Sequence, residues 1–174
     1  IPTSIDLVGP QTYHGPLPDK LTKTQRSWEI YHPHLSGDEV LIAAIAGKVV
    51  DGKLLQNSMV NLTEKIKDNR LVWQVPVGHW KLMAFWLAKN GHANAVDHFN
   101  KDAMERYCYD LGNRFKKAAG DEFGKTLESF FCDSFELPNL ASGIYWSTGL
   151  MEEYQKFKGY DLTMYLPAVW WEVD

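Results

Sequence analysis

Residues 127–136 read LESFFCDSFE, and this stretch decides the fold expected for the second half of the chain. An apolar, aromatic run without Gly or Pro is typical of a strand buried on both faces, as in parallel α/β sheets. The run ends in Asp133, Ser134 and Glu136. Loops after the carboxyl ends of such strands form ligand sites, so these carboxylates are candidates for chemistry. Asp133 and Ser134 could equally begin an ordinary turn, and the residues leave both interpretations open.

The segments on either side of this run have helical periodicity. Apolar spacing predicts an amphipathic helix from Asn100 to Ala119, with one buried stripe and Asn100 as its N-cap. A second helix is predicted from about Ser147 to Lys158, with Gly159 as its C-terminal cap. A short strand is predicted at residues 95–98. The order strand, helix, strand, helix is typical of parallel βαβα units.

The first half of the chain has the patterns of strands and tight turns. Strands are predicted at residues 4–8 and 39–50, followed by a hairpin turn at Asp51 and Gly52. The segments RLVWQV and HWKLMAFWLA are predicted to be two paired antiparallel strands joined by a turn at residues 76–78. Residues 1–92 are therefore expected to form a β-rich region, either a small sandwich or an irregular sheet.

The predicted fold class is α+β, with an N-terminal antiparallel β region followed by βαβα units resembling part of a (β/α)8 barrel. Residues 93–174 would be this partial barrel segment. A complete barrel needs roughly 200 to 250 residues, so we expect the chain to be a segment of a larger enzyme. The rings of Trp170 and Trp171 would then lack cover, which favours contact with the remainder of that enzyme or self-association.

Composition excludes several classes of protein. The 174 residues carry a formal charge of −4 and no basic stripe, which argues against a nucleic-acid surface. No stretch is apolar enough for long enough to cross a bilayer. Aromatic residues make up 13% of the chain, which suits either a sugar-binding cleft or an aromatic core. Cys108 and Cys132 are expected to be buried thiols, although a disulfide between them stays possible.

Several ordered motifs carry a family resemblance. VDHFNKDAMERY includes Asp97 and His98, and FGKTLESFFCDSFE ends in Asp133 to Glu136. IYWSTGLMEEYQKFKGYDLTMYLPAVW follows with Trp146 and the later GYDL and YLP elements, and RLVWQVPVGHWKL lies upstream. Together, over about residues 92–172, they resemble the catalytic region of glycoside hydrolase family 106, bacterial α-L-rhamnosidases that degrade polysaccharides.

The resemblance implies a secreted or periplasmic hydrolase with a (β/α) barrel and β-domains. Such an enzyme would cleave a terminal rhamnoside from a plant or microbial polysaccharide with inversion, by a pair of carboxylates, and calcium near the sugar is possible. The second carboxylate of the pair would lie on a later strand. We therefore expect this chain to be incomplete and inactive in isolation.

Inverting hydrolysis needs one protonated carboxyl group and one ionised carboxylate, about 6.5 to 9.5 Å apart. Glu136 is predicted to be one member of this pair, as the base, and Asp133 is predicted to accept a bond from a sugar hydroxyl or to support the site. Asp97 and His98 could hold sugar hydroxyls or a cation, or could bond only to loop backbone. Tyr145 and Trp146 could stack against a pyranose, or could be buried aromatic residues opening a helix.

A rival hypothesis is a non-catalytic module. The aromatic β-half would bind carbohydrate through Trp73, Trp80 or Trp86, and the second half would serve as scaffold.

Overall fold

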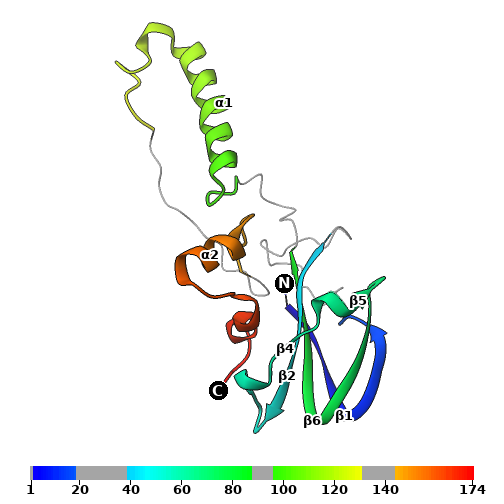
Figure 1. Ribbon diagram of the computed structural model, residues 1–174. Helices are drawn as coiled ribbons and strands as arrows, with labels where there is room; N and C mark the ends of the chain where they lie inside the picture. Colours follow the sequence, from blue (N-terminus) through cyan, green and yellow to red (C-terminus); the bar gives the residue numbers. More distant parts are fainter. Residues whose placement is uncertain (1, 19–38, 88–95, 131–143) are drawn as a thin grey trace, which may run out of the picture. The chain divides into compact units, whose positions relative to one another are not determined.

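The computed structural model describes residues 2–18, 39–87, 96–130 and 144–174 (Figure 1). The chain falls into two compact units. The first comprises Ile1–His92, Leu140–Ile144 and Gly149–Asp174, and the second comprises Ala93–Asn139 and Tyr145–Thr148. These units are defined by spatial proximity. They do not test whether residues 1–92 and 93–174 fold as separate domains, so that division remains a prediction.

The first unit is built on a curved antiparallel sheet, a half-barrel. Its long strands are β1 (Pro2–Pro16), β2 (Val40–Val50) and β6 (Arg70–Leu87), in the order β1-β6-β2 with β3 (Lys53–Leu54) beyond β2. The short strands β4 (Val60–Asn61) and β5 (Ile66–Lys67) pair with β2 and β6. The predicted hairpin turn after β2 is confirmed, since Asp51 and Gly52 have positive φ and Val50 pairs with Lys53.

The predicted turn at residues 76–78 is wrong, because β6 runs through it as one strand. Strand β1 pairs with both halves of β6, from Pro2 opposite Phe85 to Pro16 opposite Arg70, with a register shift after Gly9. A Cβ atom on Gly9 would lie 1.9 Å from the Pro76 carbonyl oxygen, so only glycine allows this approach. The Pro and Gly residues that resembled a turn therefore mark the irregularity shared by two paired strands.

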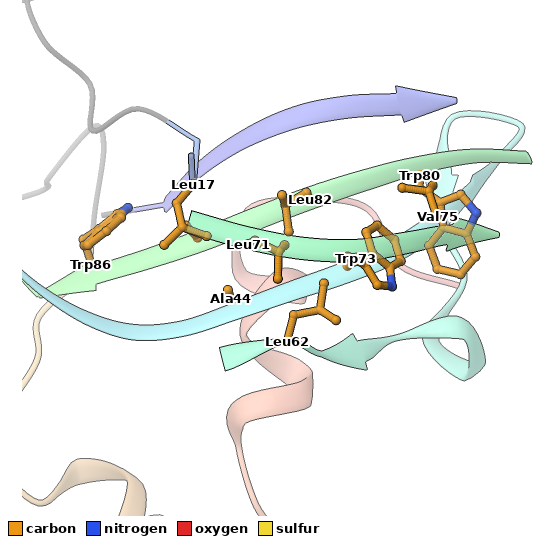
Figure 2. Packing of buried hydrophobic residues seen from close by; sticks show 11 residues of the cluster. Leu17, Ala44, Leu62, Leu71, Trp73, Val75, Trp80, Leu82 and Trp86 are labelled. Atoms are coloured by element: carbon orange, nitrogen blue, oxygen red, sulfur yellow. The ribbon is translucent and has the colours of Figure 1, made fainter. Parts of the chain in front are cut away.

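The main core fills the inner face of the curved sheet. Leu71, Trp73 and Leu82 from β6 meet Leu62, which follows β4, and their side chains point toward one another (Figure 2). The Leu62 N–H donates to the carbonyl oxygen of Ala44 at 2.8 Å, which fixes the Leu62 side chain beneath the sheet. This closed apolar cluster accounts for much of the aromatic content of the β-half.

The outer face of the same sheet is covered by the C-terminal segment. The 3-10 helix η4 (Thr163–Val169) contributes the buried Leu166. The rings of Trp170 and Trp171 lie 5.6 and 6.1 Å from that of Phe85, measured between centroids. The Leu54 N–H donates to the Glu172 carbonyl oxygen at 2.9 Å. The expectation that the two tryptophans lack cover is therefore wrong, since strand β6 supplies it.

The predicted βαβα units do not occur within the residues that the structure describes, and the (β/α) barrel class is wrong. The described structure is mostly antiparallel sheet with few helices. Strands of a parallel sheet were predicted at residues 95–98 and 127–136. Their described parts, residues 96–98 and 127–130, do not belong to a strand, and the remaining residues lie outside the described ranges. Phe130 is 53% exposed, whereas a strand buried on both faces would hide it. An apolar run shows that a segment is hydrophobic, and it does not show what covers the segment.

The predicted helices are present but are less buried than expected. Helix α1 (Lys101–Ala119) and helix α2 (Leu150–Lys158) contain no buried residue, so the predicted buried stripe of α1 is wrong. Gly159 ends α2 in a left-handed conformation, as predicted. None of the helices in the described ranges is long and apolar enough to span a membrane. Three short 3-10 helices complete the described structure: η1 (Gln56–Ser58), η2 (Thr63–Lys65) and η3 (Gly120–Glu122).

The predicted N-cap of α1 is confirmed and gives a first testable expectation. Asn100 has extended backbone, and its side-chain oxygen accepts a hydrogen bond from the Ala103 N–H at 3.0 Å. We expect Asn100→Ala to destabilise α1 by about 1 kcal/mol, because one N–H of the first turn loses its acceptor. Amide hydrogen exchange in the first turn should then accelerate. Asn100→Asp keeps the acceptor and should leave the exchange rates nearly unchanged; equal acceleration in both variants would contradict this role.

Candidate functional site

Asp97 joins two segments that are far apart in the sequence. Its Oδ2 atom accepts a hydrogen bond from the Ser147 hydroxyl at 2.8 Å, across fifty residues. Its Oδ1 atom accepts from the Phe99 N–H at 3.1 Å, and its carbonyl oxygen accepts from the Asn100 N–H at 3.1 Å. The carboxylate therefore shapes the turn that leads into α1 and at the same time holds the segment around Ser147.

This bond brings together the two segments of the second unit that carry four predicted site residues: Asp97, His98, Tyr145 and Trp146. His98 follows Asp97 and is exposed, while Tyr145 and Trp146 precede Ser147 and are half-buried. Ser147 itself is only 6% exposed. Of the two interpretations offered for Asp97, bonds to the loop backbone are present together with a side-chain partner. A role for these residues in binding sugar remains a prediction.

The two predicted catalytic carboxylates lie outside the described residues. Asp133 and Glu136 both fall within residues 131–143, so their separation from any other carboxylate also remains a prediction. Cys132 lies in the same segment. Cys108 is a free, exposed thiol on α1, so the expectation of a buried thiol at that position is wrong.

The described residues do not assemble a calcium site. Nowhere in the described ranges do three His, Cys, Asp or Glu side chains come together as a metal would require. Both carboxylate oxygens of Asp97 already accept hydrogen bonds from protein groups. These residues alone do not fit the calcium that the family resemblance makes possible.

The tryptophans of the β-half are packed into the core rather than presented to a ligand. Trp73, Trp80 and Trp86 are 5%, 6% and 7% exposed. The rings of Trp73 and Trp80 meet edge to face with centroids 5.4 Å apart, and the Trp86 indole N–H donates to the Thr3 hydroxyl at 3.2 Å. A sugar could not stack on rings that are enclosed in this way. The residues expected to carry a separate binding module are therefore core residues.

A second aromatic group lies in the first unit and is more exposed. Tyr160 contacts Tyr154 and Tyr165, with ring centroids 5.4 and 5.2 Å away, and its hydroxyl lies 2.6 Å from that of Tyr154. This hydrogen bond, with a smaller effect of desolvation, raises the pKa of Tyr160. The three rings meet at steep angles of 81° and 65°, so they share no common flat surface.

Ser147 is the residue at this site that sequence reasoning missed. It was interpreted only as the beginning of a helix, whereas α2 begins three residues later, at Leu150. Nothing in the sequence pairs a serine with an aspartate fifty positions away. The only local signal is a small polar residue directly after two aromatic residues, and this pattern is too common to identify a partner.

Comparison with known proteins identifies the class of protein. A family model described as alpha-L-rhamnosidase matches residues 39–173. A protein of Formosa agariphila named "Putative beta-glucuronidase" is 26% identical over 125 residues, covering 66% of this chain and 10% of that protein. The chain thus spans about a tenth of the length of this relative. No solved structure matches.

The family match places the chain among the glycoside hydrolases, since it covers strands β2 to β6, the Asp97–Ser147 pair and the C-terminal segment alike. The chain belongs to glycoside hydrolase family 106. The resemblance found from the motifs is thereby confirmed.

Proposed function

We propose that the protein containing this chain hydrolyses a terminal α-L-rhamnoside of a polysaccharide, with inversion at the anomeric carbon. The observation that carries the proposal is the match of residues 39–173 to the α-L-rhamnosidase family. The structure around Asp97 supports it. The hydrogen bond between Asp97 and Ser147 joins two segments, one with the exposed His98 and the other with the half-buried Tyr145 and Trp146. Aromatic faces beside polar groups are the usual components of sugar sites.

In the proposed reaction, Glu136 is the general base. Its carboxylate takes a proton from a water molecule, whose oxygen attacks the anomeric carbon from the face opposite the leaving group. The glycosidic bond breaks as a second carboxyl group, supplied by the remainder of the protein, gives its proton to the leaving oxygen. Asp133 accepts a hydrogen bond from a sugar hydroxyl. Tyr145 and Trp146 contact the apolar face of the sugar, and His98 donates to or accepts from one of its hydroxyls.

A panel of chromogenic glycosides tests this proposal directly. The full-length protein is expected to release 4-nitrophenol from 4-nitrophenyl α-L-rhamnopyranoside, and proton NMR during the reaction should show the inverted anomer of rhamnose first. The name of the Formosa agariphila relative makes 4-nitrophenyl β-D-glucuronide the necessary competitor. Faster release from the glucuronide would replace rhamnoside by glucuronide as the substrate class.

We also propose that the protein is exported to the periplasm or the medium. Its proposed substrate is a polysaccharide, and long glycans do not enter a bacterial cell intact. Fractionation of the producing bacterium, followed by immunoblotting, tests this localisation. Protein confined to the cytoplasmic fraction would contradict it.

A further inference from the structure

Ser147 stands out by its burial. Over residues 96–130 and 145–148, the described part of the second unit, Ser147 is the one buried residue, and the others are half-buried or exposed. A buried hydroxyl is costly unless it is hydrogen-bonded. The bond that satisfies it is the 2.8 Å contact with Asp97. The best-enclosed contact in this described part of the unit is thus polar.

Asp97 provides a firm attachment for this hydroxyl. Its other carboxylate oxygen is held by the Phe99 N–H, and Asn100, three residues on, caps the 19-residue helix α1. A hydrogen bond to an ionised carboxylate is roughly twice as strong as one between neutral groups. The bond therefore ties the Ser147 side chain to the turn that leads into α1, and residues 145 and 146 directly precede this attached position.

We propose that Ser147 is a positioning residue, which through its bond to Asp97 sets the orientation in which Trp146 meets the sugar. This inference rests on the proposed function, in which Trp146 contacts the substrate. In this inference Asp97 holds Ser147 in place and does not itself contact a sugar hydroxyl. A ring binds a sugar face well only if its plane is set beforehand, since ordering a loop side chain on binding costs affinity.

Steady-state kinetics of the full-length protein with 4-nitrophenyl α-L-rhamnopyranoside provide the first test. Ser147→Ala is expected to raise KM about tenfold and to change kcat less than threefold, because binding rather than chemistry is disturbed. Ser147→Thr retains the hydroxyl and should restore KM to within threefold of the unmodified value. Thr148→Ala, at the exposed neighbouring position, is the matched control and should leave KM unchanged.

A comparison of single and double variants tests whether the effect of Ser147 on KM depends on its bond to Asp97. Asp97→Ala removes the bond to Ser147 and also the bond from the Phe99 N–H, so it should raise KM at least as much as Ser147→Ala. Adding Ser147→Ala to Asp97→Ala should raise KM no further, because the bond between the two side chains is already absent. Multiplicative effects in the combined variant would show that Ser147 and Asp97 act independently, and would overturn the inference that Ser147 acts through its bond to Asp97.

Fluorine NMR gives a readout that does not depend on substrate. With 5-fluorotryptophan incorporated, Trp146→Phe identifies the Trp146 resonance, and Ser147→Ala should shift or broaden that resonance while leaving the core resonances in place. An unmoved Trp146 resonance would overturn the inference. If Trp146→Phe leaves KM unaltered while Ser147→Ala moves the resonance, the proposed contact of Trp146 with sugar fails and the structural coupling stands. Should Ser147→Ala not fold, Asp97→Asn, which weakens the bond without emptying the position, is measured by the same two criteria.

Discussion

Trp73→Ala is expected to lower the free energy of unfolding of the 174-residue chain by about 3 to 5 kcal/mol. Trp73 is 5% exposed and lies among the apolar side chains between the curved sheet and Leu62 (Figure 2). Truncating it leaves a large cavity and removes the edge-to-face contact with Trp80. The measurement is urea denaturation followed by far-UV circular dichroism.

Two further variants make this prediction discriminating. Val72 is the neighbour of Trp73 on β6 but is 55% exposed, so Val72→Ala should change stability by less than about 0.5 kcal/mol. Trp73→Phe keeps an aromatic ring and should be less destabilising than Trp73→Ala. If Trp73→Ala left stability intact and abolished sugar binding, the hypothesis of a carbohydrate-binding β-half would return.

Sequence patterns determine features that depend on neighbouring residues, and they do not determine contacts between distant segments. Local signals were interpreted correctly: the turn at Asp51, the Asn100 cap and the Gly159 cap each depend on a few neighbouring atoms. The family resemblance was also identified correctly, because several motifs occur in a fixed order. Such features can be predicted without knowledge of long-range packing.

The failures concern contacts between distant segments. The Pro and Gly residues at 76–78 suggested a turn, but β1 lies along the whole of β6 and makes that segment part of one strand. The rings of Trp170 and Trp171 were expected to be uncovered, yet Phe85 contacts both. In each case the deciding partner is many residues away, and tertiary contact overrides the local pattern.

At the candidate site, too, a contact between distant segments was missed. Residue types suggested Asp97, His98, Tyr145 and Trp146 as one group, and the bond between Asp97 and Ser147 does bring their segments together. The bond itself could not be predicted, because serine and aspartate are common surface residues and no periodicity connects positions 97 and 147. The bond brings the segments of these four residues together, and their role in binding sugar remains a prediction.

The largest effect is expected at Glu136. In the full-length protein, Glu136→Gln should lower kcat for 4-nitrophenyl α-L-rhamnopyranoside by about 10² to 10⁴, the usual contribution of a general base. Glutamine is nearly the same size but cannot accept the proton of the attacking water, so substrate binding should be retained and KM should change little. Glu128 belongs to the same stretch and is exposed, which makes Glu128→Gln the matched control, with kcat expected to remain within twofold.

Chemical rescue then separates the base from the acid. If Glu136 is the base, added azide should restore turnover of Glu136→Gln, because this anion attacks the anomeric carbon without needing its proton removed, and the product should be the glycosyl azide of inverted configuration. If Glu136 is instead the acid, azide should have little effect, whereas a 2,4-dinitrophenyl leaving group, which departs without protonation, should recover most of the lost rate. Near-normal kcat in Glu136→Gln would exclude both roles and would move the search for the catalytic carboxylate to other residues of the protein.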